Sequence, residues 1–153
     1  MLASAHTPFI FLEVFLSRVI NPESAGKDRT RLVKGVALAL RQLVQQQDTG
    51  AQTRDLAAFI ALALENIAET IEASVGPWEK RDYWVKADRF RMEWAWAGRL
   101  GKAMRQAVLA DDWMSVARLS GEIGGKLGTV KLAERNRLGE PWVGAFSRLK
   151  ETP

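Results

Sequence analysis

A regular alternation of four-residue and three-residue steps joins the apolar residues of one long segment. Its positions are Tyr83, Ala87, Phe90, Trp94, Ala97, Gly101, Met104 and Val108. Because an α-helix has about 3.6 residues per turn, side chains at these spacings form one apolar seam along a single helix. A second apolar line follows roughly the opposite side of the same helix, at Val85, Met92, Trp96, Ala103 and Ala107. A helix that is apolar on two sides is expected at the centre of a bundle or at a subunit interface.

The rest of the chain carries the same helical periodicity, with no alternating run long enough to predict a β-strand. Residues 8–21 and 28–47 read as the first two helices, and a third begins near Thr53. Gly76 and Pro77 are expected to end the third helix and begin the long one, since Gly suits a helix C-terminus and Pro suits a first turn. We therefore predict an all-α fold, a bundle of about five or six helices around a long central helix (about 77–109).

The two aspartates Asp111 and Asp112 predict a helix stop followed directly by a new N-terminus. The next helix (about 112–127) is then expected to fold back as an antiparallel, close-packed hairpin partner of the long helix. In that register Gly101 lies opposite Gly121, with two further pairs of small residues beside them. Glycine costs a helix interior about 1 kcal/mol relative to alanine, so we expect these glycines to mark close backbone contact.

Length and composition are those of one folded unit. A chain of 153 residues with 47% hydrophobic and 26% charged residues supports one domain spanning 1–153. The absence of cysteine excludes disulfides and sulfur-ligated zinc and is typical of a cytoplasmic protein. The apolar run 9–20 contains Glu13 and Arg18 and is too short to span a bilayer, so we expect a first core helix and no membrane partner. A final amphipathic segment from Glu140 onwards is expected to dock on the bundle.

Positive charge is concentrated in the second half of the chain. Residues 77–153 contain 15 basic and 10 acidic side chains, against 7 and 8 in residues 1–76. One edge of the expected long helix carries Arg81, Trp84, Arg91, Arg99 and Lys102, which we name the basic strip. Cations beside an aromatic ring are typical of grooves that bind single-stranded nucleic acid. A solvated, arginine-rich helix face is the competing interpretation.

Four carboxylates form the alternative candidate site. Glu65, Glu69 and Glu72 follow four-residue and three-residue steps on the third helix, and Asp82 follows shortly afterwards. Carboxylate oxygens are suitable ligands for Mg²⁺ or Mn²⁺, which would permit metal-dependent hydrolysis. Because the intervening segment is too short to bring two antiparallel helices over one ion, a solvated acidic face is the favoured interpretation, and no metal site is predicted.

Other catalytic signatures are weak. His6 is the only histidine and lies near the N-terminus, which disfavours a catalytic triad and excludes a ferritin-type di-iron site. The glycine-rich segment 121–128 lacks the first glycine and the final Ser or Thr of a phosphate-binding loop. We therefore expect no cofactor.

Three functions follow from these patterns, in order of preference. The first is a non-enzymatic helical interaction protein that self-associates or serves as a small subunit of a larger assembly; its six tryptophans favour such a role. The second is a nucleic-acid-binding accessory protein that uses the basic strip. The third is a metal-dependent hydrolase that uses Glu65, Glu69, Glu72 and Asp82.

Overall fold

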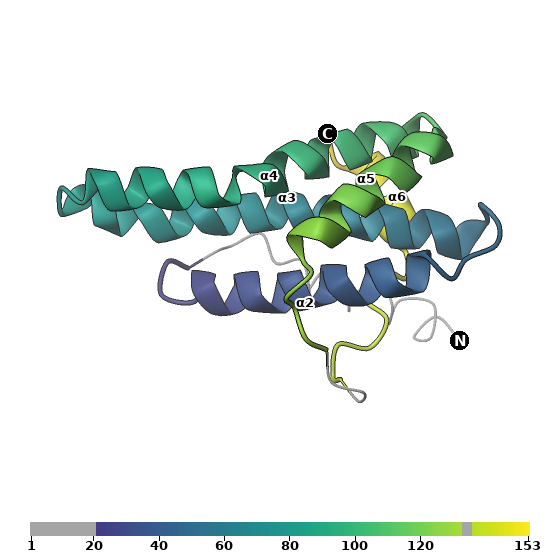
Figure 1. Ribbon diagram of the computed structural model, residues 1–153, viewed down its shortest axis with the longest axis horizontal. Helices are drawn as coiled ribbons and strands as arrows, with labels where there is room; N and C mark the ends of the chain where they lie inside the picture. Colours follow the sequence, from purple (N-terminus) through teal and green to yellow (C-terminus); the bar gives the residue numbers. More distant parts are fainter. Residues whose placement is uncertain (1–20, 133–135) are drawn as a thin grey trace.

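The computed structural model describes residues 21–132 and 136–153. Within these ranges all regular secondary structure is α-helical, and Figure 1 shows how the helices are arranged. The helices are α2 (Ala25–Leu43), α3 (Ala51–Lys80), α4 (Trp84–Leu109), α5 (Trp113–Lys126) and α6 (Ala145–Glu151). The predicted all-α bundle is confirmed. The helix expected over 8–21 lies, apart from Asn21, outside the described residues.

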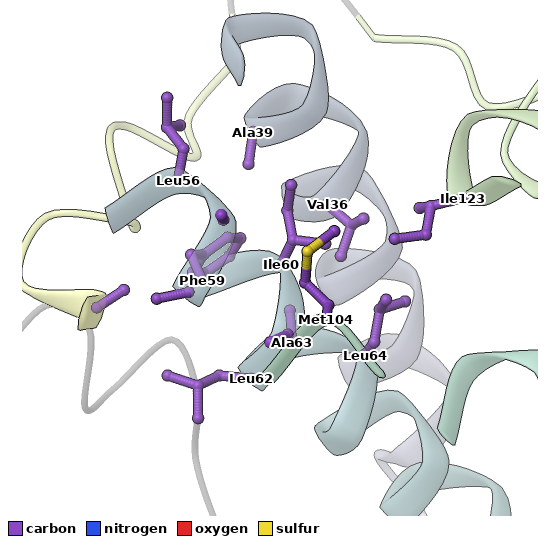
Figure 2. Packing of buried hydrophobic residues seen from close by; sticks show 14 of the residues in the cluster. Val36, Ala39, Leu56, Phe59, Ile60, Leu62, Ala63, Leu64, Met104 and Ile123 are labelled. Carbon is purple, nitrogen blue, oxygen red and sulfur yellow. The ribbon is translucent and has the colours of Figure 1, made fainter. Parts of the chain in front are cut away.

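The central helix of the bundle is α3, which contacts α2, α4 and α6. Its nine consecutive residues 56–64 are all buried, so this segment is covered on every side. Phe59 and Ile60 meet Val36 of α2 and Met104 of α4 in one apolar cluster, as Figure 2 shows. A helix that is apolar all round is expected to be buried, and the alanines between the large side chains let neighbouring helices approach. The prediction of a central helix at about 77–109 is therefore corrected.

The expected boundary at Gly76 and Pro77 is wrong, because α3 continues through both residues to Lys80. Pro77 lies in the last turns of α3, where its missing N–H removes one helical hydrogen bond without ending the helix. The break comes at Asp82, which adopts a left-handed conformation with φ 63°. There the N–H of Tyr83 donates to the carbonyl of Trp78 at 2.9 Å, the closing hydrogen bond of a Schellman turn.

The second expected break, at Asp111 and Asp112, is confirmed, and it is formed by the same type of Schellman turn. Asp111 has φ 56°, and the N–H of Asp112 donates to the carbonyl of Ala107 at 2.9 Å. The carboxylate of Asp112 then caps α5 by accepting hydrogen bonds from the N–H of Ser115 at 3.2 Å and its hydroxyl at 2.6 Å. An aspartate in the left-handed region thus ends both α3 and α4.

The expected glycine contact between α4 and α5 is wrong. The close partner of Gly101 is α3, because a Cβ at this position would lie 3.0 Å from Leu64 Cβ and 3.1 Å from the backbone nitrogen of Glu65. Gly121 of α5 faces open space. The reason is the path of α5, which crosses the bundle obliquely from α4 towards α2 instead of running back along α4 (Figure 1). The close-packed antiparallel hairpin is formed by α3 and α4.

The C-terminal segment docks on the bundle, as predicted. Trp142 and Leu149 are buried, and the carboxylate of Asp55 on α3 accepts hydrogen bonds from the N–H groups of Gly144 (3.1 Å) and Phe146 (2.9 Å). These two N–H groups lie at the start of α6, where backbone donors lack helical partners. Residues 130–132 and 136–138 are not helical, so the described part of the expected 130–138 segment differs from the prediction.

Candidate interaction surfaces

An apolar groove with a volume of about 640 Å³ lies between the C-terminal end of α2, the start of α3 and α5. We call it the α2–α5 groove. Its apolar lining comprises Leu40 and Leu43 from α2, Val44 directly after α2, and Trp113, Val116 and Ala117 from α5. Ser120, Gly121 and Gly124 complete the α5 side. Their small size leaves the space between the helices unfilled, and at Gly124 a Cβ would lie 3.5 Å from Leu40 Cδ2.

One end of the α2–α5 groove is acidic. Asp48 lines the groove, and its carbonyl accepts a hydrogen bond of 2.8 Å from the Thr53 hydroxyl, which fixes the loop before α3. The indole N–H of Trp113 donates to the carboxylate of Asp111 at 2.6 Å, so this acid is held beside the groove. Hydrogen bonds from Ser115 lower the pKa of the neighbouring Asp112 and keep its carboxylate charged. The groove therefore combines apolar walls with three carboxylates at or near one end, of which Asp111 also lies 3.8 Å from the guanidinium of Arg54.

A second apolar surface lies at the turn between α3 and α4, which we call the hairpin tip and define as Tyr83, Trp84 and Val85. Their side chains are 53%, 53% and 67% exposed. The Schellman turn at Asp82 places all three at the end of the hairpin, which extends beyond α2 in Figure 1. Cations outnumber acids in the chain around this apolar surface. The cations are Lys80, Arg81, Lys86 and Arg89, and the acids are Asp82 and Asp88.

Further large apolar side chains are exposed elsewhere. Val44 beside the α2–α5 groove is 72% exposed, Met92 on α4 is 73% exposed and Met114 on α5 is 86% exposed. Val85 and Met92 belong to the second apolar line of α4 and are separated by seven residues, so they share one outer face. Trp96 and Ala103 on the same line are only half-buried. Ala107, the last residue of the line, is buried, so only the N-terminal part of the second apolar line, at Val85 and Met92, is an exposed face.

The residues of the basic strip differ in their exposure and in their ion pairs. Arg81 and Lys102 are exposed, and Trp84 is at the hairpin tip. Arg91 is half-buried and donates two hydrogen bonds of 2.9 Å to the carboxylate of Glu79, with two more to Glu72 at 3.0 Å. These contacts raise the pKa of Arg91 and lower that of Glu79.

Arg99 lies 3.6 Å from Glu122 of α5, in a mostly exposed ion pair. Two of the four cations of the basic strip therefore have carboxylate partners within the chain. The remaining two, Arg81 and Lys102, are separated by most of the length of α4. The exposed charge of the strip is consequently divided between its two ends.

The four candidate metal ligands do not form one site. Glu65 makes hydrogen bonds of 2.6 and 2.8 Å with the guanidinium of Arg105, Glu72 pairs with Arg91, and Asp82 forms the turn after α3. Glu69 lies exposed on α3 and takes part in an interaction of its own. Across residues 21–132 and 136–153, no three His, Asp or Glu side chains are grouped suitably for a metal ion. His6 lies outside the described residues. This geometry gives the metal-dependent hydrolase no support.

An arginine enters the junction of α2, α3 and α4. Nη1 of Arg29 donates hydrogen bonds to the hydroxyls of Ser74 (3.2 Å) and Thr70 (3.3 Å), and the guanidinium carbon lies 4.8 Å from the centre of the Phe90 ring and 5.7 Å from that of Trp94. Burial lowers the pKa of Arg29, and the more distant charge of Glu93 opposes this change. The arrangement is a cation–π cluster that joins three helices.

No protein-family model matches the chain, and no curated protein or solved structure is significantly similar to it. In the part of the chain that the structure describes, no helix has the length and apolar character needed to cross a membrane. The surfaces of the molecule therefore provide the evidence on function.

The α2–α5 groove was not predicted from the sequence, although its signal is present. Ala117, Gly121 and Gly124 recur at four-residue and three-residue steps, which indicates a helix face that a neighbour can approach closely. The sequence analysis assigned this face to α4. In the structure Gly121 faces open space, because α5 crosses the bundle obliquely. The sequence alone does not show this path.

Proposed function

We propose that the protein is a non-enzymatic helical interaction protein, which self-associates or serves as a small subunit of a larger assembly. One observation carries this proposal: the described part of the bundle has an apolar groove and a separate exposed apolar tip, each with several large side chains. Contiguous apolar surface of this kind on a folded chain is typical of protein interaction sites.

The energetic reason is the burial of apolar area. Removing apolar surface from water stabilises an association by about 25 cal/mol per Å² before the costs of binding are subtracted. Tryptophan and tyrosine are the side chains that most often dominate such interfaces. Trp84 and Tyr83 are half-exposed at the hairpin tip, and Trp113 lines the α2–α5 groove. Both surfaces therefore contain the residue types expected at the centre of an interface.

Nucleic-acid binding by the basic strip is the alternative. Arg81 and Trp84 favour it, because an exposed cation beside an exposed indole can bind a phosphate and stack on a base. The ion pairs of Arg91 with Glu79 and of Arg99 with Glu122 count against it, since an incoming phosphate must compete with these carboxylates. We therefore keep it second.

One experiment separates the two functions. The mass of the purified protein is measured by light scattering, and its tryptophan fluorescence is followed while a mixed single-stranded oligonucleotide is added at low and moderate salt. Both forms of the proposal predict no saturable quenching, and self-association also predicts a mass above the 17.1 kDa of one chain. A 17.1 kDa species whose fluorescence is quenched in a salt-sensitive manner would contradict it and support nucleic-acid binding.

A further inference from the structure

We infer that copies of this chain associate head to tail, with the hairpin tip of one copy bound in the α2–α5 groove of the next. This inference rests on the proposed function and specifies its partner, a second copy, and the two surfaces that meet. Three independent observations support it: the chemistry of the two surfaces, their charges and their positions in the molecule.

The chemistry of the two surfaces matches. The tip presents Trp84 with Tyr83 and Val85 on either side, and the groove has apolar walls from α2 and α5 and a volume of about 640 Å³. An aromatic side chain buries about 150–250 Å² when it enters such a site. Pockets that accept one or two aromatic anchors from a projecting turn are typical centres of protein interfaces.

The charges of the two surfaces are complementary. Lys80, Arg81, Lys86 and Arg89 flank the tip and outnumber its two acids, Asp82 and Asp88. The groove has Asp48 in its lining and Asp111 and Asp112 beside Trp113. Asp111 also lies 3.8 Å from Arg54 in an exposed ion pair, so Asp48 and Asp112 provide most of the negative charge there. Cations around the apolar anchor therefore meet carboxylates around the apolar site, which increases the rate of association and selects one orientation. An acidic partner would be repelled from the same end of the groove.

The positions of the two surfaces exclude contact within one chain. The tip lies at one end of the α3–α4 hairpin, and the α2–α5 groove lies towards the opposite end of the molecule, where α2 and α4 end (Figure 1). Because the surfaces differ, their contact is heterologous, and a dimer joined by one such contact keeps a free tip and a free groove. Such contacts produce either a closed ring or an open chain of copies.

Two variants, each defective in one surface, test this arrangement. Trp84→Ala removes the anchor of the tip, and Ala117→Arg places a long cation in the groove, where it fills space and repels the basic tip. Both residues are exposed, so neither change is expected to disturb folding. We expect each variant alone to have the mass of one chain. An equimolar mixture still contains one intact tip and one intact groove, so it should form a dimer of twice 17.1 kDa.

Two controls accompany the mixture. Trp84→Phe retains an aromatic anchor and should preserve association, and Met114→Arg adds the same charge as Ala117→Arg on an exposed part of α5 that does not line the groove. Circular dichroism of every variant checks that the helices are formed. Association that survives both Trp84→Ala and Ala117→Arg would overturn the head-to-tail contact and leave the interaction function standing. A wild-type protein that is monomeric at every concentration would contradict self-association itself.

Discussion

Arg29 carries a positive charge into the junction of three helices, where it is held by hydroxyl groups and aromatic faces. Its pKa is lowered by burial, so the charged form is less favourable there than in water. The side chain nevertheless packs against Phe90 and Trp94, and its apolar stem contributes to that contact. The packing and the charge of Arg29 are therefore expected to act in opposite directions on stability.

Substitution of Arg29 separates these two effects. Arg29→Met keeps most of the volume and removes the charge, and we expect it to change the free energy of unfolding by less than about 1 kcal/mol. Arg29→Ala also removes the packing, and we expect a loss of about 1–3 kcal/mol. Urea unfolding followed by circular dichroism measures both. A loss for Arg29→Met as large as that for Arg29→Ala would show that the charge itself stabilises the junction.

The Arg91–Glu79 pair joins α4 to the last turn of α3, and it gives the hairpin a dependence on pH. The hydrogen bonds from Arg91 lower the pKa of Glu79 in the folded protein. The resulting stabilisation is complete above the ordinary glutamate pKa, about 4.3. It is lost as the pH falls through the lower pKa of the folded state.

We expect Glu79→Gln to lower the urea midpoint at neutral pH and to have a much smaller effect near pH 3, about one unit below the ordinary glutamate pKa. Asp88→Asn is the matched control, because the carboxylate of Asp88 is 70% exposed and lies 3.7 Å from Arg91. It should change the midpoint less than Glu79→Gln at neutral pH. An equal effect of Glu79→Gln at both pH values would show that the pair does not supply this stabilisation.

At the scale of the helices, the glycines decide which elements pack closely. Gly101→Ala introduces a methyl group 3.0 Å from Leu64 Cβ and 3.3 Å from the carbonyl oxygen of Ala61, and we expect a loss of about 1–3 kcal/mol from overpacking. Gly121→Ala enters open space and should stabilise the protein by up to about 1 kcal/mol through helix propensity. Thermal and urea unfolding measure both changes. A loss of stability in both variants would instead support the glycine pairing that the sequence suggested.

The existence of the helices could be predicted from the sequence, whereas their ends and partners could not. Apolar periodicity located α2, α3, α4 and α5, and the Asp111–Asp112 pair located the start of α5. Pro77 misled the prediction, because a proline costs less near the end of a helix than in its middle and only tertiary packing shows that α3 continues. Asp82 ends α3 through a left-handed conformation that glycine adopts more often. The central position of α3 follows from residues 56–64, whose alanines give little hydrophobic signal of their own.

At the scale of the whole molecule, the candidate interaction site too could be predicted only in part from the sequence. The sequence identified Trp84 and the second apolar line of α4, which includes the exposed Val85 and Met92. It did not identify the α2–α5 groove, because the groove depends on how α5 crosses the bundle. It also did not identify the partners of Arg91 and Arg99, since these lie on other helices. Candidate interface residues could be predicted from the sequence, whereas their partners on other helices could be identified only from the structure.

The central claim is that copies of this protein associate through the hairpin tip and the α2–α5 groove, and hydroxyl-radical footprinting of dilute and concentrated samples tests it most directly. Radical attack on tryptophan and methionine reports the exposure of each side chain. We predict that Trp84 becomes protected at high concentration, whereas Met114, 86% exposed and outside the groove lining, serves as the internal reference and keeps its reactivity. Equal reactivity of Trp84 in the dilute and concentrated samples would contradict the claim.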